Sequence, residues 1–253
     1  MRIPLAALVA ALAFGQAGAV TTIRTAAQTE SEPKYLPAED GKGIRGLCVD
    51  LYRAIEQADP NLRFVGDQAA LPLKRLETMV ERGELDAFCG LVRNAEREAR
   101  FVYAEPALYN VAYRVAIRAD DRVSVAGWDD VRKLGADGIL LVNQGSGAVK
   151  RLEEFGGLKI DAGGRTTGEN LSKLLAGRGR FYYYRTPGLK GEIRRAGLAD
   201  KIRILPATLD VTPFYLLFNK AVPRATVEAV NRALAQLQAR GELARILDRW
   251  DDE

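Results

Sequence analysis

Histidine is absent from this 253-residue chain, and only two cysteines are present. Without an imidazole, the chain cannot form the Ser-His-Asp or Cys-His groups that activate the nucleophile in many hydrolases. Imidazole metal sites are excluded for the same reason, and two cysteines cannot complete a four-cysteine zinc site. We therefore expect no metal site and no cofactor, and any catalysis would depend on carboxylates, lysine, tyrosine or a borrowed cofactor.

Runs of like charge are also missing, because no block of five residues of one sign occurs and 37 basic residues are spread among 33 acidic ones. This pattern gives little support for nucleic-acid binding, and we expect no nucleic-acid partner. Glycine (24) and proline (10) are at ordinary levels, which excludes a collagen-like or low-complexity chain. With 47% hydrophobic residues, the chain is long enough for one large domain or two of ordinary size.

A long apolar segment is present at the N-terminus. Arg2 precedes the apolar residues 3–14, and Ala17-Gly18-Ala19 fits the small-x-small rule for signal-peptide cleavage. The segment is about a dozen residues long, well short of the roughly 20 needed to span a bilayer. The sequence therefore predicts a signal peptide at residues 1–19, cleaved after Ala19, and a periplasmic location. The alternative is an N-terminal membrane anchor or a buried helix.

Export would place Cys48 and Cys89 in an oxidising compartment, where a disulfide is the default expectation. The bridge would close a loop of about 40 residues, for which the chain-entropy model gives about 4 kcal/mol of stabilisation. The alternative is two separate buried thiols, because free cysteine is often a core residue. We expect the disulfide.

The apolar pattern after the signal peptide predicts two sets of strands and helices. The first set contains strands at 21–26, 62–66 and 85–90 and helices at 49–58 and 72–83. This order is typical of a parallel sheet covered by helices. The second set contains strands at 138–142, 180–184 and 202–205 and helices at 146–155, 167–176 and 189–196. The predicted fold class is therefore α/β.

Two extended apolar segments connect these sets, at 111–117 and 212–219, and two helices at 227–238 and 242–250 close the chain. Two β/α sets joined by two such segments indicate two lobes with a double crossing between them. A ligand would then bind between the lobes, outside the carboxyl ends of the strands. The predicted boundaries are residues 20–112 and 213–253 for lobe 1 and residues 113–212 for lobe 2.

Five parts of the sequence share a recognisable order and spacing that covers nearly all of the mature chain. They are 46–51 (GLCVDL), 76–87 (LETMVERGELDA), 90–109 (GLVRNAEREARFVYAEPALY), 128–131 (WDDV) with 144–146 (QGS), and 233–250 (ALAQLQARGELARILDRW). Together they resemble the extracellular (periplasmic) solute-binding protein family 3, the polar amino-acid-type substrate-binding components of ABC transporters. The resemblance implies a two-lobed, periplasmic binding protein-like fold, in which each lobe is a β-sheet flanked by helices and two hinge crossings join the lobes.

The resemblance implies that Arg97 binds a carboxylate of the ligand. A guanidinium offers a carboxylate two parallel donors in a charge-assisted pair; the alternative is a surface arginine in a charge-rich turn. The family uses the turn at Gly145 and Ser146 against the same carboxylate, where the following helix has free N–H groups, unless Ser146 acts only as a helix cap. Gly90 and Leu91 match positions that offer backbone groups to a ligand.

The sequence departs from the family where amino-acid binders hold the ligand ammonium with an acidic residue. At this place, after the strand predicted at 180–184, the chain has Tyr184-Arg185 and no carboxylate. Arg185 would repel an ammonium group, which argues against a standard α-amino acid. Tyr184 would stack on a ring or cap an apolar tail, or would only fill the strand surface. We expect both residues to contact the ligand.

The N-terminal loop contains Gln28, Glu30 and Tyr35, where family members often place an aromatic residue and polar ligand contacts. Glu30 would supply, from the other lobe, the carboxylate missing beside Arg185. The alternative is that Glu30 is one of many exposed loop acids. We include all three residues among the predicted ligand contacts.

The predicted function is a periplasmic protein that binds a small carboxylate-bearing solute, an amino acid or an organic acid, and delivers it to an inner-membrane ABC permease. We expect a monomer and no enzyme activity. One alternative is an accessory or sensor binding protein without a transporter. Another is an enzyme similar to the periplasmic cyclohexadienyl dehydratases of this fold, which would need a general acid or base other than histidine.

Overall fold

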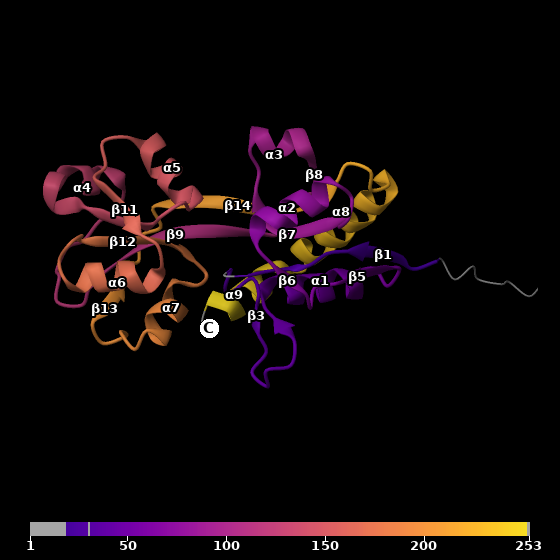
Figure 1. Ribbon diagram of the computed structural model, residues 1–253, viewed down its shortest axis with the longest axis horizontal. Helices are drawn as coiled ribbons and strands as arrows, with labels where there is room; N and C mark the ends of the chain where they lie inside the picture. Colours follow the sequence, from indigo (N-terminus) through magenta and orange to yellow (C-terminus); the bar gives the residue numbers. More distant parts are fainter. Residues whose placement is uncertain (1–18, 30, 252–253) are drawn as a thin grey trace, which may run out of the picture.

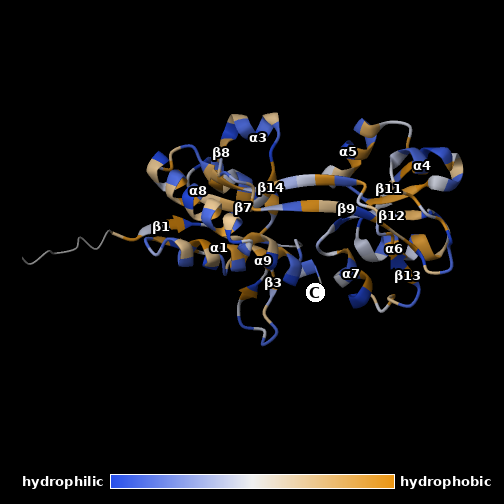
Figure 2. Ribbon diagram, turned by 180° about the vertical axis from the view of Figure 1, so that it is seen from behind, coloured by the Kyte–Doolittle hydropathy of each residue, from blue (hydrophilic) through white to orange (hydrophobic). Residues whose placement is uncertain are grey.

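The computed structural model describes residues 19–29 and 31–251, so the predicted signal peptide, apart from Ala19, lies outside the described residues. Two lobes lie side by side along the longest axis of the molecule, and two long strands run from one to the other (Figure 1). The same two strands remain adjacent when the molecule is seen from behind (Figure 2).

These strands are β9 (Tyr109–Arg118) and β14 (Asp210–Asn219), which occupy the two extended apolar segments of the sequence. They pair in antiparallel fashion, with Tyr109 opposite Phe214 and Tyr113 opposite Asp210. β9 leads the chain out of lobe 1 and β14 returns it, so the predicted double crossing is confirmed.

Lobe 1 is built from the chain on both sides of the crossing. Its helices are α1 (Leu47–Ala58), α2 (Leu73–Glu81), α3 (Ala95–Arg100), α8 (Arg224–Ala239) and α9 (Glu242–Asp251). Its strands are β1 (Thr21–Arg24), β2 (Ala27–Gln28), β3 (Leu36–Pro37), β4 (Ile44–Arg45), β5 (Leu62–Val65), β6 (Ala70–Leu71), β7 (Ala87–Val92) and β8 (Phe101–Tyr103). One apolar core joins them, with buried residues between Ile23 and Val111 and between Leu216 and Trp250.

The parallel sheet expected for the first set is only partly correct. β1 pairs in parallel with β5. β7 instead pairs in antiparallel fashion with β14, so that Phe88 lies opposite Leu217 and Cys89 opposite Leu216. The partner of β7 therefore comes from a segment more than a hundred residues away, which local apolar patterning does not indicate.

Lobe 2 consists of a sheet with helices on both faces. Its strands are β10 (Leu140–Asn143), β11 (Ile160–Gly164), β12 (Phe181–Thr186) and β13 (Ile202–Ile204). Its helices are α4 (Trp128–Lys133), the short 3-10 helix η1 (Gly135–Gly138), α5 (Gly147–Phe155), α6 (Thr167–Leu175) and α7 (Leu189–Arg195). The strand order is β11-β10-β12-β9, with β10 parallel to both of its neighbours and β9 antiparallel to β12; β13 pairs with β9.

The tyrosine-rich strand β12 shows how lobe 2 packs. Phe181 and Tyr183 lie in one apolar cluster with Leu152 of α5. Tyr182, between them, lies in a second cluster with Leu171 of α6. Successive side chains of a strand point to opposite faces of its sheet. This run of aromatic residues therefore anchors the helices on both faces.

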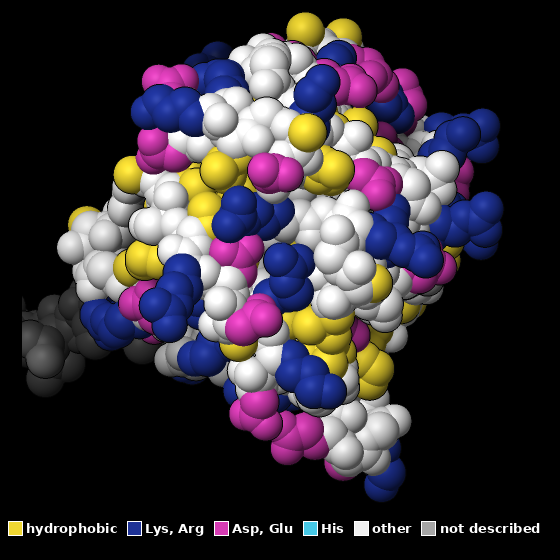
Figure 3. Space-filling view, turned by 90° about the vertical axis from the view of Figure 1, so that its left-hand side faces the viewer, with side chains coloured by type: hydrophobic (Ala, Val, Ile, Leu, Met, Phe, Trp, Pro, Cys, Tyr) yellow, Lys and Arg dark blue, Asp and Glu magenta, His cyan; other side chains and the backbone are white. Residues whose placement is uncertain are grey.

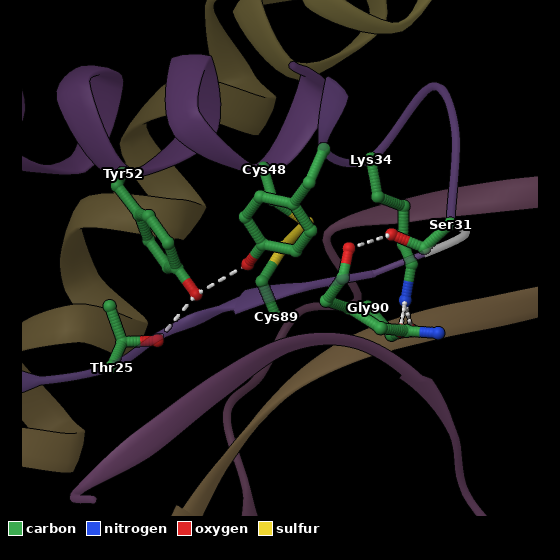
Figure 4. Close-up of a disulfide and its surroundings, with 9 residues drawn as sticks. Thr25, Ser31, Lys34, Cys48, Tyr52, Cys89 and Gly90 are labelled. Atoms are coloured by element: carbon green, nitrogen blue, oxygen red, sulfur yellow. Dashed lines mark hydrogen bonds between the residues drawn. A yellow bond between two sulfur atoms is a disulfide. The ribbon is translucent and has the colours of Figure 1, made fainter. Parts of the chain in front are cut away.

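The disulfide predicted between Cys48 and Cys89 is confirmed. Cys48 lies in the first turn of α1 and Cys89 lies within β7, and both are fully buried. The bridge ties the start of α1 to the strand that carries Gly90, close to Lys34 (Figure 4).

Charged residues of both signs are interspersed on the outer end of lobe 2 (Figure 3). In this lobe Arg132 pairs with Asp129 at 2.7 Å, for example. That face lacks the single-sign stripe typical of nucleic-acid-binding surfaces. Within the described part of the chain, no helix has the length and apolar character needed to cross a membrane.

A buried carboxylate in lobe 2 makes stability depend on pH. Arg180 donates to both carboxylate oxygens of Asp121, at 2.8 and 2.9 Å, which holds the pKa of Asp121 down at about 2. Because folding lowers this pKa, the pair stabilises the native state above about pH 4, and the contribution is lost as the pH falls toward 2. We expect Asp121→Asn to lower the free energy of unfolding by about 1–2 kcal/mol at neutral pH.

Urea unfolding of the wild type and of Asp121→Asn, measured from neutral pH down to about pH 2, tests this expectation. The difference between the two proteins should shrink as the pH falls below about 4, where Asp121 begins to be protonated in the unfolded chain but not yet in the native state. A difference that stays constant over the whole range would contradict the assignment to this pair.

Candidate functional site

A cavity of about 340 Å³ lies where the two lobes face each other beside the crossing strands. This volume is typical of a site for a small molecule. Seven of the predicted ligand contacts line it: Gln28, Gly90, Leu91, Arg97, Ser146, Tyr184 and Arg185. The structure thus brings candidate residues of both lobes to the wall of one cavity.

Of the three other predicted contacts, two do not line this wall and the third is not described. Tyr35 is buried in the core of lobe 1, where its hydroxyl lies 3.0 Å from that of Tyr52, so its side chain packs against α1 instead. Gly145 forms an exposed turn and does not line the cavity, whereas Asn143 before it and Ser146 after it do. Glu30 lies outside the described residues.

Arg97 reaches the cavity from α3, a six-residue helix that the apolar pattern did not predict. Asn94 caps this helix by accepting from the Arg97 backbone N–H at 2.9 Å. Glu77 of α2 accepts from Nε and Nη2 of Arg97, at 3.0 and 2.6 Å, and the Val92 carbonyl accepts from Nη1 at 3.4 Å. A guanidinium has five N–H donors. One donor therefore remains on each terminal nitrogen, and a carboxylate can accept from both terminal nitrogens of a guanidinium.

The start of α5 brings a second anion contact from lobe 2. Ser146 is the N-cap residue, and both Ser146 and Gly147 line the cavity. The Ser146 hydroxyl is shielded from water and makes no hydrogen bond within the described chain, so it does not cap the helix. The first turn of a helix also has unpaired N–H groups and a partial positive charge. These donors from lobe 2 and the guanidinium of Arg97 from lobe 1 line the same cavity, and both kinds of group are suited to an anion.

Lys34 is a cavity residue that the sequence did not reveal. It lies between β2 and β3, is 6% exposed, and donates from Nζ to Gln28 Oε1 at 2.5 Å and to the Gly90 carbonyl at 3.2 Å (Figure 4). Nζ also lies 5.2 Å from the centre of the Phe88 ring. In a polar loop, no pattern distinguishes such a lysine from a solvated one.

Backbone hydrogen bonds to the start of α1 fix the position of Lys34. The carbonyls of Pro33 and Lys34 accept from the N–H groups of Leu47 and Cys48, at 2.9 and 3.1 Å. Gly46 permits this approach, because its φ is +146° and a Cβ there would lie 2.2 Å from the Lys34 carbonyl oxygen. A larger residue at position 46 would push the loop, and Lys34 with it, away from α1.

The charge of Lys34 has no carboxylate partner among the described residues. Burial, together with the charges of Arg185 and Arg97, holds the pKa of Lys34 well below its usual value. Buried charges in proteins are normally paired, because an unpaired one is costly. An anion bound in the cavity would supply the missing partner.

Two further polar side chains line the wall, and the hydroxyl of one of them, Tyr109, is shielded from water. Tyr109 is 7% exposed, its hydroxyl has no hydrogen-bond partner in the described chain, and burial raises its pKa, so it remains a neutral donor. Arg185 lies over the ring of Tyr184, 5.3 Å from its centre, and makes one long hydrogen bond, from Nη1 to the Pro187 carbonyl at 3.5 Å.

Positive charge dominates this wall. Lys34, Arg97 and Arg185 line the cavity, whereas no Asp or Glu does so within residues 19–29 and 31–251. No group of His, Cys, Asp and Glu in the same residues is placed to hold a metal ion. Such a wall attracts anions and repels cations.

Solved structures with the same architecture identify the fold. The chain is similar to the probable amino-acid ABC transporter extracellular-binding protein ytmK from Bacillus subtilis, with a TM-score of 0.76 and 18% identity over 92% of this chain and 99% of that one. It is also similar to a protein from Wolinella succinogenes, described as a binding component of an ABC transporter and solved with lysine, with a TM-score of 0.70 and 18% identity over 92% and 96% of the two chains. The predicted two-lobed, periplasmic binding protein-like α/β fold is therefore confirmed.

A search of curated proteins finds no match to this chain. The family model of bacterial extracellular solute-binding proteins, family 3, matches residues 23–253, which include both lobes and both crossing strands. The family resemblance drawn from the sequence is thereby confirmed. The chain belongs to the bacterial extracellular solute-binding proteins of family 3.

Proposed function

We propose that the protein binds a small carboxylate-bearing solute in the cavity between its lobes. The observation that carries this proposal is the meeting of Arg97 from lobe 1 and the start of α5 from lobe 2 on one cavity wall. Each group alone is ordinary, but together they offer one carboxylate donors from both lobes. Such contacts favour the closed arrangement of a hinged protein.

We assign the remaining ligand contacts to other residues that line the same cavity. Gln28, Gly90, Leu91 and Tyr184 would surround the body of the ligand, and Arg185 would face its far end. Glu30 stays a hypothesis for a polar contact. We further propose that the protein acts by binding alone, as a monomer. It would act in the periplasm and deliver its ligand to an inner-membrane ABC transporter, since the similar structures are described as binding components of ABC transporters.

A thermal-unfolding screen tests the proposal. The mature chain, residues 20–253, is unfolded and refolded to remove any ligand and is then screened against amino acids, monocarboxylates, dicarboxylates, aromatic acids and sugars. A ligand of the native state stabilises it by about 2.7 kcal/mol at 100 times the Kd. We expect a rise in Tm with one or more carboxylic acids. A rise with sugars alone would overturn the proposal, and loss of ligand uptake in cells lacking the protein would support delivery to a transporter.

A further inference from the structure

The cavity has more positive charge than one carboxylate requires. Arg97 and the start of α5 are sufficient to hold one carboxylate. Lys34 and Arg185 then remain on the same wall, and neither makes an ion pair with a described residue. A single carboxylate bound to Arg97 and α5 would leave the charges of Lys34 and Arg185 without a partner on the cavity wall.

Lys34 has the features expected of a side chain that contacts a ligand. An ammonium group has three N–H donors, and its two hydrogen bonds, to Gln28 and Gly90, leave one donor. Both partners are neutral, so they satisfy hydrogen bonds without balancing the charge. The side chain is more than nine-tenths buried and still lines the cavity, so this charge is directed to the space where a ligand would lie.

The free hydroxyl of Tyr109 lies beside Lys34. A Cβ on Gly90, which has φ +81°, would be 2.6 Å from the Tyr109 hydroxyl oxygen and 2.9 Å from Lys34 Cδ. Both side chains therefore pack over the same backbone position of β7. An ammonium group and a neutral, water-shielded hydroxyl, both with unused hydrogens, therefore lie together at this position, separate from Arg97 and α5.

We propose that the ligand is a dicarboxylate whose second carboxylate binds Lys34 and Tyr109, with Arg185 nearby. This inference rests on the proposed function and names its substrate class. The first carboxylate binds Arg97 and the start of α5. A zwitterionic amino acid would instead bring an ammonium group toward Lys34 and Arg185, where like charges repel in a poorly solvated space.

Matched probes test the second contact. Straight-chain dicarboxylates from oxalate to adipate and the benzene dicarboxylates are titrated by isothermal calorimetry. The tightest is compared with its own monoamide, which lacks one charge, and with its amino derivative, which adds an ammonium group. We expect the monoamide to bind at least about 30-fold more weakly and the amino derivative to bind more weakly still.

The variant Lys34→Met keeps the length of the side chain and removes the charge. It should bind the dicarboxylate about 30-fold more weakly and bind the monoamide about as well as the wild type does. The ligand-free variant should unfold at the same or a higher temperature, because an unpaired buried charge is removed. Lys42→Met, at an exposed position of the same N-terminal segment, is the control and should bind like the wild type.

The outcomes separate this inference from the proposed function. If dicarboxylates and monocarboxylates bind equally well to the wild type and to Lys34→Met, the dicarboxylate inference is wrong and carboxylate binding stands. Tighter binding of the amino derivative than of the dicarboxylate would also overturn the inference. If Glu30→Gln then lost this tighter binding, Glu30 would be identified as the acid that binds the ammonium group. Preferred binding of sulfate or phosphate would replace the dicarboxylate with an inorganic anion. A panel in which no carboxylic acid binds would contradict both proposals.

Discussion

Replacing Arg97 with lysine is expected to weaken binding of the carboxylate ligand by about 100-fold, or about 2.7 kcal/mol. Lysine keeps the positive charge but cannot present two parallel N–H donors to a carboxylate. In this protein the remaining donors of Arg97 are one on each terminal nitrogen, because Glu77 and the Val92 carbonyl accept the others. Calorimetric titration of the best ligand into wild type and Arg97→Lys measures the loss.

The matched control is Arg100→Lys. Arg100 lies in the same helix and also pairs with Glu77, at 3.5 Å, but it does not line the cavity. This variant should bind the ligand as the wild type does. If both variants lose affinity equally, the effect passes through Glu77 and α3, and Arg97 does not bind the carboxylate. Wild-type affinity in Arg97→Lys would likewise contradict the assignment.

Removing the disulfide is expected to lower the free energy of unfolding by about 4 kcal/mol. The bridge joins residues 41 positions apart, and in the chain-entropy model it stabilises the native state by restricting the unfolded chain. Replacement of both Cys48 and Cys89 with alanine avoids a free thiol. Guanidinium unfolding of the double variant should show a clearly lower midpoint than that of the oxidised wild type.

The reduced wild type separates the bridge from the packing of its sulfur atoms. Both sulfurs are buried, so alanine also leaves unfilled volume, whereas reduction retains both sulfur atoms. A similar midpoint for the reduced wild type and the double variant would assign the effect to the bridge. An unchanged midpoint after reduction would contradict the chain-entropy account.

Much of the fold could be predicted because local patterns determine it. Apolar spacing predicted α8 within three residues of its start and one of its end. Helix α3 was not predicted because AEREAR has no apolar stripe, and its start depends on the Asn94 cap. Strand β11 was not predicted because IDAGG has few residues that favour strands. These elements are held by caps and by pairing with β10, which a local pattern does not contain.

The site could be predicted only where a family pattern carried it. Arg97 and Ser146 belong to recognisable segments, and both line the cavity. Lys34 and Tyr35 are neighbours in a polar loop, yet the first lines the cavity and the second fills the core of lobe 1. That division depends on how the loop docks on α1 beside Gly46, which is a tertiary contact. The lobe boundaries at residues 112 and 212 stay a prediction.

The crystal structure of the protein with the acid that raises its Tm most would test directly where and how the ligand binds. We predict one ligand between the lobes, with a carboxylate within hydrogen-bond distance of both Arg97 and the start of α5 and a second acidic group on Lys34. A ligand bound outside this cavity, or one that presents a cationic group to Lys34 and Arg185, would contradict this prediction.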